Sequence, residues 1–205
     1  VRLVVQSPYL LGIGLLIILY STLSTFLYLQ QASIIQDSFS SSAERTSVFA
    51  MIDLAVNVLT VLLQLFVTSR LVKYLGLPLS LAIIPALLVV GFIALATAPV
   101  LAVLIVVQVL RRAGNFAIMR PEWEMLYSVL GREEKYKAKN FIDTVVYRGG
   151  DAASSWVYDG LRAMGLGIGQ IAMIAAPLAG VWAYVSWQLG RRREQMEVNQ
   201  EETRS

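Results

Sequence analysis

The feature that most constrains this chain is a series of long apolar segments. The segments are continuous rather than alternating, which is typical of membrane helices and not of the strands of a membrane barrel. A helix needs about 20 mostly apolar residues to cross a bilayer. Of the 205 residues, 57% are hydrophobic and 15% are charged. We therefore predict an all-α membrane protein with six transmembrane helices, at residues 8–30, 48–68, 78–97, 99–119, 138–158 and 166–188.

These spans define a transmembrane domain at residues 1–189 and a polar cytoplasmic tail at residues 190–205. The chain begins with Val1 and carries no recognisable signal sequence, so we expect it to be part of a longer or processed protein. Gly165, Gly167 and Gly169 precede the last span without a strand before them. We expect a turn there and not a dinucleotide-binding loop.

The basic residues are distributed unevenly between the two sides of the predicted bundle. Twelve fall on one side and only Arg45 and Arg162 on the other, while Arg111, Arg112 and Arg148 lie inside spans. The side rich in positive charge is cytoplasmic by the positive-inside rule, so both termini are expected in the cytoplasm. Topology thus explains the basic excess, and we expect no nucleic-acid partner. The twelve are Arg2, Arg70, Lys73, Arg120, Arg132, Lys135, Lys137, Lys139, Arg191, Arg192, Arg193 and Arg204.

Several enzyme classes are excluded by composition. The chain has no histidine and no cysteine, which rules out histidine base catalysis, thiol nucleophiles, disulfides and the usual zinc sites. It also lacks a phosphate-binding loop that could support ATP hydrolysis. We therefore expect no enzyme, no cofactor and no metal site.

Polar side chains recur on single faces of three spans. Asp53 and Asn57 begin such a series in the second span, and Arg111, Arg112 and Asn115 extend one in the fourth. A charged residue facing lipid at a helix centre costs about 2.5–3.5 kcal/mol, so these faces should turn inward. The third and sixth spans are almost wholly apolar and should lie outside. The fifth span carries the longest series, which comprises Asn140, Asp143, Thr144, Tyr147, Arg148, Asp151, Ser154 and Tyr158.

An arrangement in which every third helix is peripheral is typical of half of a major-facilitator-type transporter. Such carriers bind substrate near the bilayer midplane, between two six-helix halves. The expected partners are the lipid bilayer and an N-terminal six-helix half, in the same polypeptide or in a second subunit.

The arginines inside the spans suggest an anionic small molecule, because guanidinium groups bind phosphate or carboxylate in two-point fashion. Two alternatives remain open. Arg148 could pair with Asp151, and Arg111 or Arg112 with Asp143 or Asp53, purely to join helices. Asp53 and Asp143 could instead be proton relays. The candidate substrate-binding residues are Arg148, Arg111, Arg112, Asn115, Lys139, Asp143, Asp151, Asp53 and Asn57.

A cytoplasmic connector is expected between the fourth and fifth spans. Trp123, Leu126, Tyr127 and Leu130 recur there at helical spacing, which predicts a short amphipathic helix at the membrane interface.

Two stretches of this region resemble the second half of the ATP:ADP antiporter (nucleotide translocase) family. They are Arg120–Leu126, which contains Glu124-Met125, and Glu133–Asp151, which contains Lys137-Ala138-Lys139, Ile142-Asp143 and Arg148-Gly149-Gly150. The resemblance implies a carrier of two six-helix halves that exchanges nucleotides across the membrane of intracellular bacteria or plastids. By this analogy Arg148, Lys139 and Asp143 are functional, and the chain belongs in a bacterial inner membrane.

We therefore predict the C-terminal half of a secondary transporter that moves an anionic substrate, with a nucleotide among the candidates, by alternating access. The alternative is a transport-inactive scaffold that keeps the transporter fold. Family exchangers carry an acidic residue and lysines near the end of the first helix of this half, where residues 26–32 of this chain are uncharged.

Overall fold

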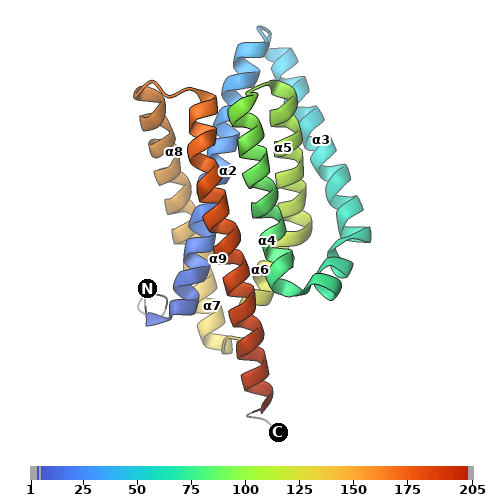
Figure 1. Cartoon of the computed structure of the whole chain (residues 1–205), viewed down its shortest axis with the longest axis vertical. Helices are drawn as coiled ribbons and strands as arrows, with labels where there is room; N and C mark the ends of the chain where they lie inside the picture. The colour runs from blue at the N-terminus through green and yellow to red at the C-terminus, as the bar shows by residue number, and fades with distance from the viewer. Residues whose placement is uncertain (1–3, 5, 203–205) are drawn as a thin grey trace.

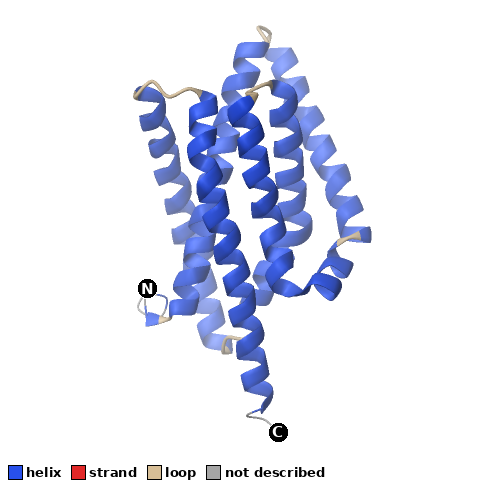
Figure 2. Ribbon diagram, in the orientation of Figure 1, coloured by secondary structure: helices blue, strands red, loops and turns tan. Residues whose placement is uncertain are grey.

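The computed structural model describes Val4 and residues 6–202, and all its regular elements are helices (Figure 2). Two segments are π-helical, η1 and η2, and each joins α-helices without a break. In chain order the elements are α2 (Pro8–Ser38), α3 (Ser42–Phe66), α4 (Thr68–Thr97), α5 (Leu101–Gly114), η1 (Asn115–Met119), α6 (Arg120–Leu126), α7 (Arg132–Phe141), η2 (Ile142–Val146), α8 (Tyr147–Ala163) and α9 (Ile168–Glu202).

The prediction of an all-helical membrane protein is confirmed. Because α5, η1 and α6 form one rod and α7, η2 and α8 another, the described residues form six rods at the predicted places (Figure 1). Five of these are long and apolar enough to cross a membrane. The exception is the rod that contains the predicted span 138–158, since its polar series lowers its hydropathy.

Several helices extend beyond the predicted membrane spans, whose bounds stay a prediction. α2 continues beyond residue 30 to Ser38, and α3 begins at Ser42 instead of residue 48, because a short turn at residues 39–41 connects the two helices. Ser41 starts α3 through a capping box, in which it accepts from Ala43 N while Glu44 accepts from the Ser41 amide. The tail predicted at residues 190–205 continues α9 as a helix to Glu202, and it extends beyond the other helices (Figure 1).

The short helix expected between the fourth and fifth spans is present as α6, but it continues the fourth rod instead of standing apart from it. Leu126 and Tyr127 are buried in the bundle, and the position of this helix at a membrane interface stays a prediction. Tyr9 of α2 donates a hydrogen bond to the Leu126 carbonyl at 2.8 Å, which fastens this segment to the bundle.

The two apolar helices α4 and α9 lie side by side along their length (Figure 1). A Cβ atom on Gly190 of α9 would lie 2.5 Å from Cα of Pro78, so only glycine allows this approach. Ala172, Ala176 and Ala179 form the rest of the close-packed face of α9. Small residues allow helices to pack closely, although Gly180 makes no such contact. Its partner α4 bends at Gly76, whose φ is +74°.

Gly165 has φ of +87° in the link between α8 and α9, which confirms the predicted turn. Both described chain ends lie at the same end of the bundle, with α8 at one edge and α3 at the opposite edge (Figure 1).

Candidate functional site

The polar residues of the rods meet in a groove made of two adjoining depressions, which share Phe116, Arg120 and Tyr147. The first, which we call the arginine depression, has a volume of about 410 Å³ and includes Arg111, Asn115 and Asp151. The second, the lysine depression, has a volume of about 510 Å³ and includes Lys139, Glu124 and Asp143. The groove is lined by α2, by the α5–η1–α6 rod and by the α7–η2–α8 rod.

Arg111 is the most buried charge of the arginine depression, with 8% of its surface exposed. Its Nη1 donates to Ser24 Oγ at 2.7 Å and its Nε to Gln108 Oε1 at 3.0 Å. No carboxylate forms an ion pair with it among the described residues. Neutral oxygens orient this guanidinium without cancelling its charge, so the charge remains available to an anion.

The neighbouring Arg112 is neutralised. Its Nη1 lies 2.5 Å from Oδ1 of Asp53, which joins α5 to α3 across the bundle. The two side chains are 30% and 56% exposed. For this pair the structure matches the helix-joining alternative.

Asp151 is held by α2 and not by Arg148. Its Oδ1 accepts hydrogen bonds from Thr25 at 2.5 Å and from Ser21 at 3.1 Å. The alternative in which Arg148 pairs with Asp151 therefore does not hold for the described residues. Gly150, one residue before, packs on Ser21 at ordinary contact distance and α8 shows no break at the glycine pair.

Three of the predicted site residues lie outside both depressions, namely Arg148, Asn57 and Asp53. Arg148 is exposed on α8 and Asn57 is exposed on α3, and neither has a hydrogen bond or an ion pair with another described residue. Asp53 is linked to the groove by its ion pair with Arg112, which lines the arginine depression. The other six candidates line one of the two depressions.

In the lysine depression Lys139 is paired with Glu124 of α6. Asp143, in η2, lines the same depression and forms no ion pair among the described residues. This depression therefore carries mixed charge, whereas the arginine depression is mainly cationic.

Asn115 adds an unsatisfied hydrogen-bonding group to the arginine depression. The side chain is 3% exposed and its Oδ1 has no partner among the described residues. A buried amide oxygen without a partner is costly, so this position suits a ligand that donates a hydrogen bond.

Arg120 was missed as a site residue, since the sequence places it just beyond a predicted span. It lines both depressions, and its guanidinium lies 4.8 Å from the ring centre of Phe116. The sequence spacing could have identified Arg120 as a site residue, because Arg112, Phe116 and Arg120 follow one another at steps of four and so lie on one helix face.

Aromatic rings form one wall of the groove. Tyr20 lies edge-on to Trp123, with ring centres 4.9 Å apart, and also contacts Tyr147 and the buried Trp182. Such a wall offers ring faces to a flat ligand and keeps the polar side chains in place.

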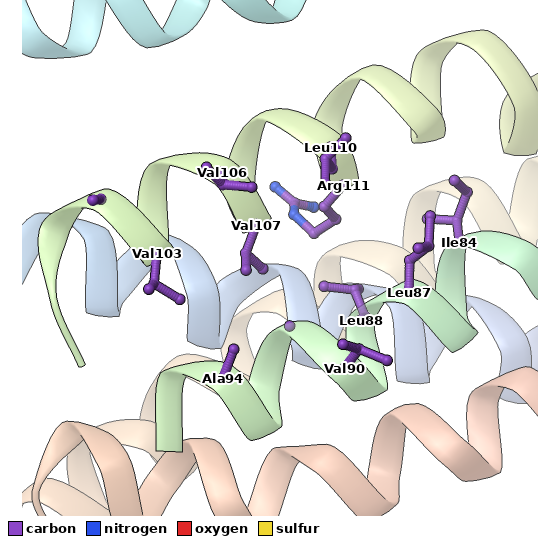
Figure 3. Close-up of a pocket in the computed structure, with 12 residues that line it drawn as sticks. Ile84, Leu87, Leu88, Val90, Ala94, Val103, Val106, Val107, Leu110 and Arg111 are labelled. Carbon is purple, nitrogen blue, oxygen red and sulfur yellow. The ribbon is translucent and has the colours of Figure 1, made fainter. Parts of the chain in front are cut away.

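A separate crevice of about 410 Å³ lies between α4 and α5 (Figure 3). Its lining is apolar apart from Arg111, which extends from α5 between Val107 and Leu88 (Figure 3). It offers no second polar group to a polar substrate. The candidate site is therefore the polar groove and not this crevice.

The two π-helical segments flank the groove, since η1 contributes Phe116 and η2 contributes Asp143. Single π-helical turns are frequent at functional sites. No group of three or more His, Cys, Asp or Glu side chains suited to a metal was found among the described residues.

Comparison with known proteins gives one distant relative. The chain is 26% identical over 176 residues to the ADP,ATP carrier protein 1 of Chlamydia muridarum (strain MoPn / Nigg). The match covers 76% of this chain and 33% of the relative, so the chain spans about a third of that carrier's length. No family model matches the chain, and no solved structure matches it significantly.

Proposed function

This similarity supports the ATP:ADP antiporter family for the chain, as a partial match, and from that premise we propose that the chain is the C-terminal half of a secondary transporter. The substrate is an anion of the nucleotide type. The chain supplies one wall of the translocation path, and an N-terminal six-helix half supplies the other.

One observation carries the proposal most directly. Arg111 is buried in an apolar bundle, is oriented by Ser24 and Gln108, and has no carboxylate partner among the described residues. An arginine that only joined helices would be expected to pair with a carboxylate, as Arg112 does with Asp53. A guanidinium left charged beside Arg120 in a groove suits a phosphate group.

The groove also suits the rest of a nucleotide. The half-buried ring of Tyr147, which lines both depressions, is available for stacking, and Asn115 can accept a hydrogen bond from an amino or hydroxyl group. Alternating access requires the groove to open to each side in turn, and the π-helical turns in two of its rods are suitable places for bending.

The test is ATP exchange by the complete polypeptide in proteoliposomes loaded with ADP. Arg111→Ala should abolish exchange while insertion and yield stay normal. Arg132→Ala, at the exposed start of α7, is the matched control and should exchange at the wild-type rate. Wild-type exchange by Arg111→Ala would disprove the proposed role of this arginine.

The rival function is a transport-inactive scaffold. The end of α2 supports it, because Gln30 and Gln31 are buried there and Gln31 accepts a 2.5 Å hydrogen bond from Gln108, where family exchangers carry charges. A scaffold predicts no exchange and no shift of the melting temperature with ATP. A carrier predicts ATP exchange and a rise of the melting temperature with ATP.

A further inference from the structure

Glu122 is a buried carboxyl group that the proposed transport site does not use. It lies in the first turn of α6 with 1% of its surface exposed. Ser80 of α4 donates a hydrogen bond to its Oε1, and its Oε2 is buried with no hydrogen-bond partner among the described residues. No described cation forms an ion pair with it.

None of the described charged or titratable groups forms a hydrogen bond or an ion pair with Glu122. Tyr9 bonds to the Leu126 carbonyl, Lys139 pairs with Glu124, and Arg193 pairs with Glu197 and donates to Ser128. On α6 itself Arg120 lies over Phe116, and the hydroxyl of the adjoining Tyr127 is buried with no hydrogen-bond partner among the described residues. The groups on the surrounding elements include Tyr9, Tyr20, Tyr28 and Asp37 of α2, Arg70, Lys73 and Tyr74 of α4, Arg111 and Arg112 of α5, Arg120 and Glu124 of α6, Tyr127, Lys139 of α7, and Tyr184, Arg191, Arg192, Arg193, Glu194, Glu197 and Glu202 of α9.

An ionised carboxylate in this position would be strongly unfavourable. Burial without a cation costs several kcal/mol per ion, and one serine hydroxyl compensates only part of that. The neutral acid avoids the penalty. We propose that Glu122 is a proton-binding site, protonated while it is bonded to Ser80 of α4 and ionised when this contact between α6 and α4 opens.

The proton step is simple to balance. On release the O–H bond of Glu122 breaks, the proton passes to water, and the electron pair stays on the carboxylate, which becomes negative. Rebinding is the reverse. Ionisation makes the contact of α6 with α4 unfavourable, so the charge change drives the helices apart.

The position of Glu122 couples this step to the groove. Arg120 and Trp123, on the same turn of α6, line the lysine depression, and Arg120 also lines the arginine depression. The π-helical η1 directly precedes α6 and can absorb a change in its direction. Proton binding at Glu122 then changes the affinity of the groove for an anion, and anion binding changes the proton affinity of Glu122 by the same factor. This linkage rests on the proposed function.

The test begins with thermal unfolding of the complete polypeptide, without ligand, from mildly acidic to mildly alkaline pH. Since the folded protein favours protonated Glu122, wild-type stability should fall as pH rises and the proton is lost. Glu122→Gln removes the titrating group, so it should match wild type at acidic pH and be more stable at alkaline pH. Glu134→Gln, on exposed α7, should follow wild type. Parallel profiles for Glu122→Gln and wild type would overturn the proposal.

A second variant decides the matter if Glu122→Gln does not fold. Ser80→Ala removes the hydroxyl that bonds to the carboxyl group among the described residues, so the ionised form becomes less favourable still. The fall in stability should begin at the same pH as in wild type, continue to higher pH and reach a larger total. A fall of the same extent as in wild type would contradict the proposal.

ATP binding gives an independent readout. In the proposed linkage, the affinity of wild type for ATP varies over the same pH range, and that variation is absent in Glu122→Gln. If the protein binds no ATP at any pH, the transport proposal fails while the unfolding profiles still test Glu122. Equal pH variation of ATP affinity in both proteins would refute the linkage.

Discussion

Nε of Arg111 donates a hydrogen bond to Oε1 of Gln108 at 3.0 Å, and this contact orients the Gln108 amide. Arginine can only donate, so the amide oxygen must face it. The amide nitrogen then donates to Gln31 of α2 at 2.5 Å. The result is a guanidinium fixed between two helices by neutral groups, with its positive charge intact.

Replacing Gln108 with Glu should test this relationship. The new carboxylate would lie beside Arg111 and neutralise it, so ATP binding should be lost while the melting temperature stays at or above the wild-type value. Isothermal titration and thermal unfolding on the complete polypeptide measure both quantities. Gln170→Glu makes the same chemical change in the exposed first turn of α9 and should leave ATP binding intact. Undiminished binding by Gln108→Glu would contradict the assigned role of Arg111.

Replacing Glu124 with Gln should release Lys139 from its ion pair. The partners are 31% and 56% exposed, so the free energy of unfolding should change by about 1 kcal/mol or less. The freed cation adds positive charge to the groove, so ATP affinity should rise at low salt and return toward wild type at high salt. Glu133→Gln, whose partner Lys137 is also exposed, is the control. An affinity that falls in Glu124→Gln would show that the pair itself holds the site together.

Arg148 lies outside both depressions, and its expected role rests on the family resemblance alone. If that resemblance holds for function, replacing Arg148 with Ala should abolish transport with little effect on stability. The side chain is exposed, lies on the polar face of α8 and contacts no described partner through a hydrogen bond or an ion pair. Its loss should therefore change the free energy of unfolding by about 0.5 kcal/mol or less. Exchange assays and thermal unfolding on the same preparation separate the two effects. Normal exchange would remove Arg148 from the substrate-binding residues.

Replacing Gly190 with Ala should destabilise the contact of α9 with α4. The added Cβ would lie 2.5 Å from the Pro78 backbone, which cannot move aside without shifting the helix. Overpacking of this kind costs about 1–3 kcal/mol. Gly160→Ala meets no atom within 4 Å and should cause no loss. Equal melting temperatures for the two variants would show that the α4–α9 contact is looser than described.

The helical fold could be predicted because its signal lies in local hydropathy. Helix ends depend on capping and on neighbouring chains, so the extension of α2 to Ser38 and of α9 to Glu202 was missed. The π-helical turns at Asn115–Met119 and Ile142–Val146 also escape periodicity, because each continues the helices on both sides without a break.

The candidate site could be predicted in part, because the positions of polar residues along each helix are also a local property of the sequence. Periodicity identified Arg111, Arg112, Asn115 and Asp151, because polar residues in membrane helices rarely face lipid. It did not reveal which charges are neutralised, since the pairing of Arg112 with Asp53 requires two helices to be placed in space. Arg120 was assigned to a connector because the apolar segment of the sequence ends before the helix does.

The central claim is that Arg111 binds the charged part of an anionic substrate. It is tested most directly by equilibrium titration of the complete polypeptide with ATP and with adenosine, for wild type and for Arg111→Gln. Wild type should bind ATP far more tightly than adenosine, with an affinity that weakens as salt rises, and Arg111→Gln should lose that preference. Equal affinity for ATP and adenosine, or an unchanged preference in Arg111→Gln, would contradict the account.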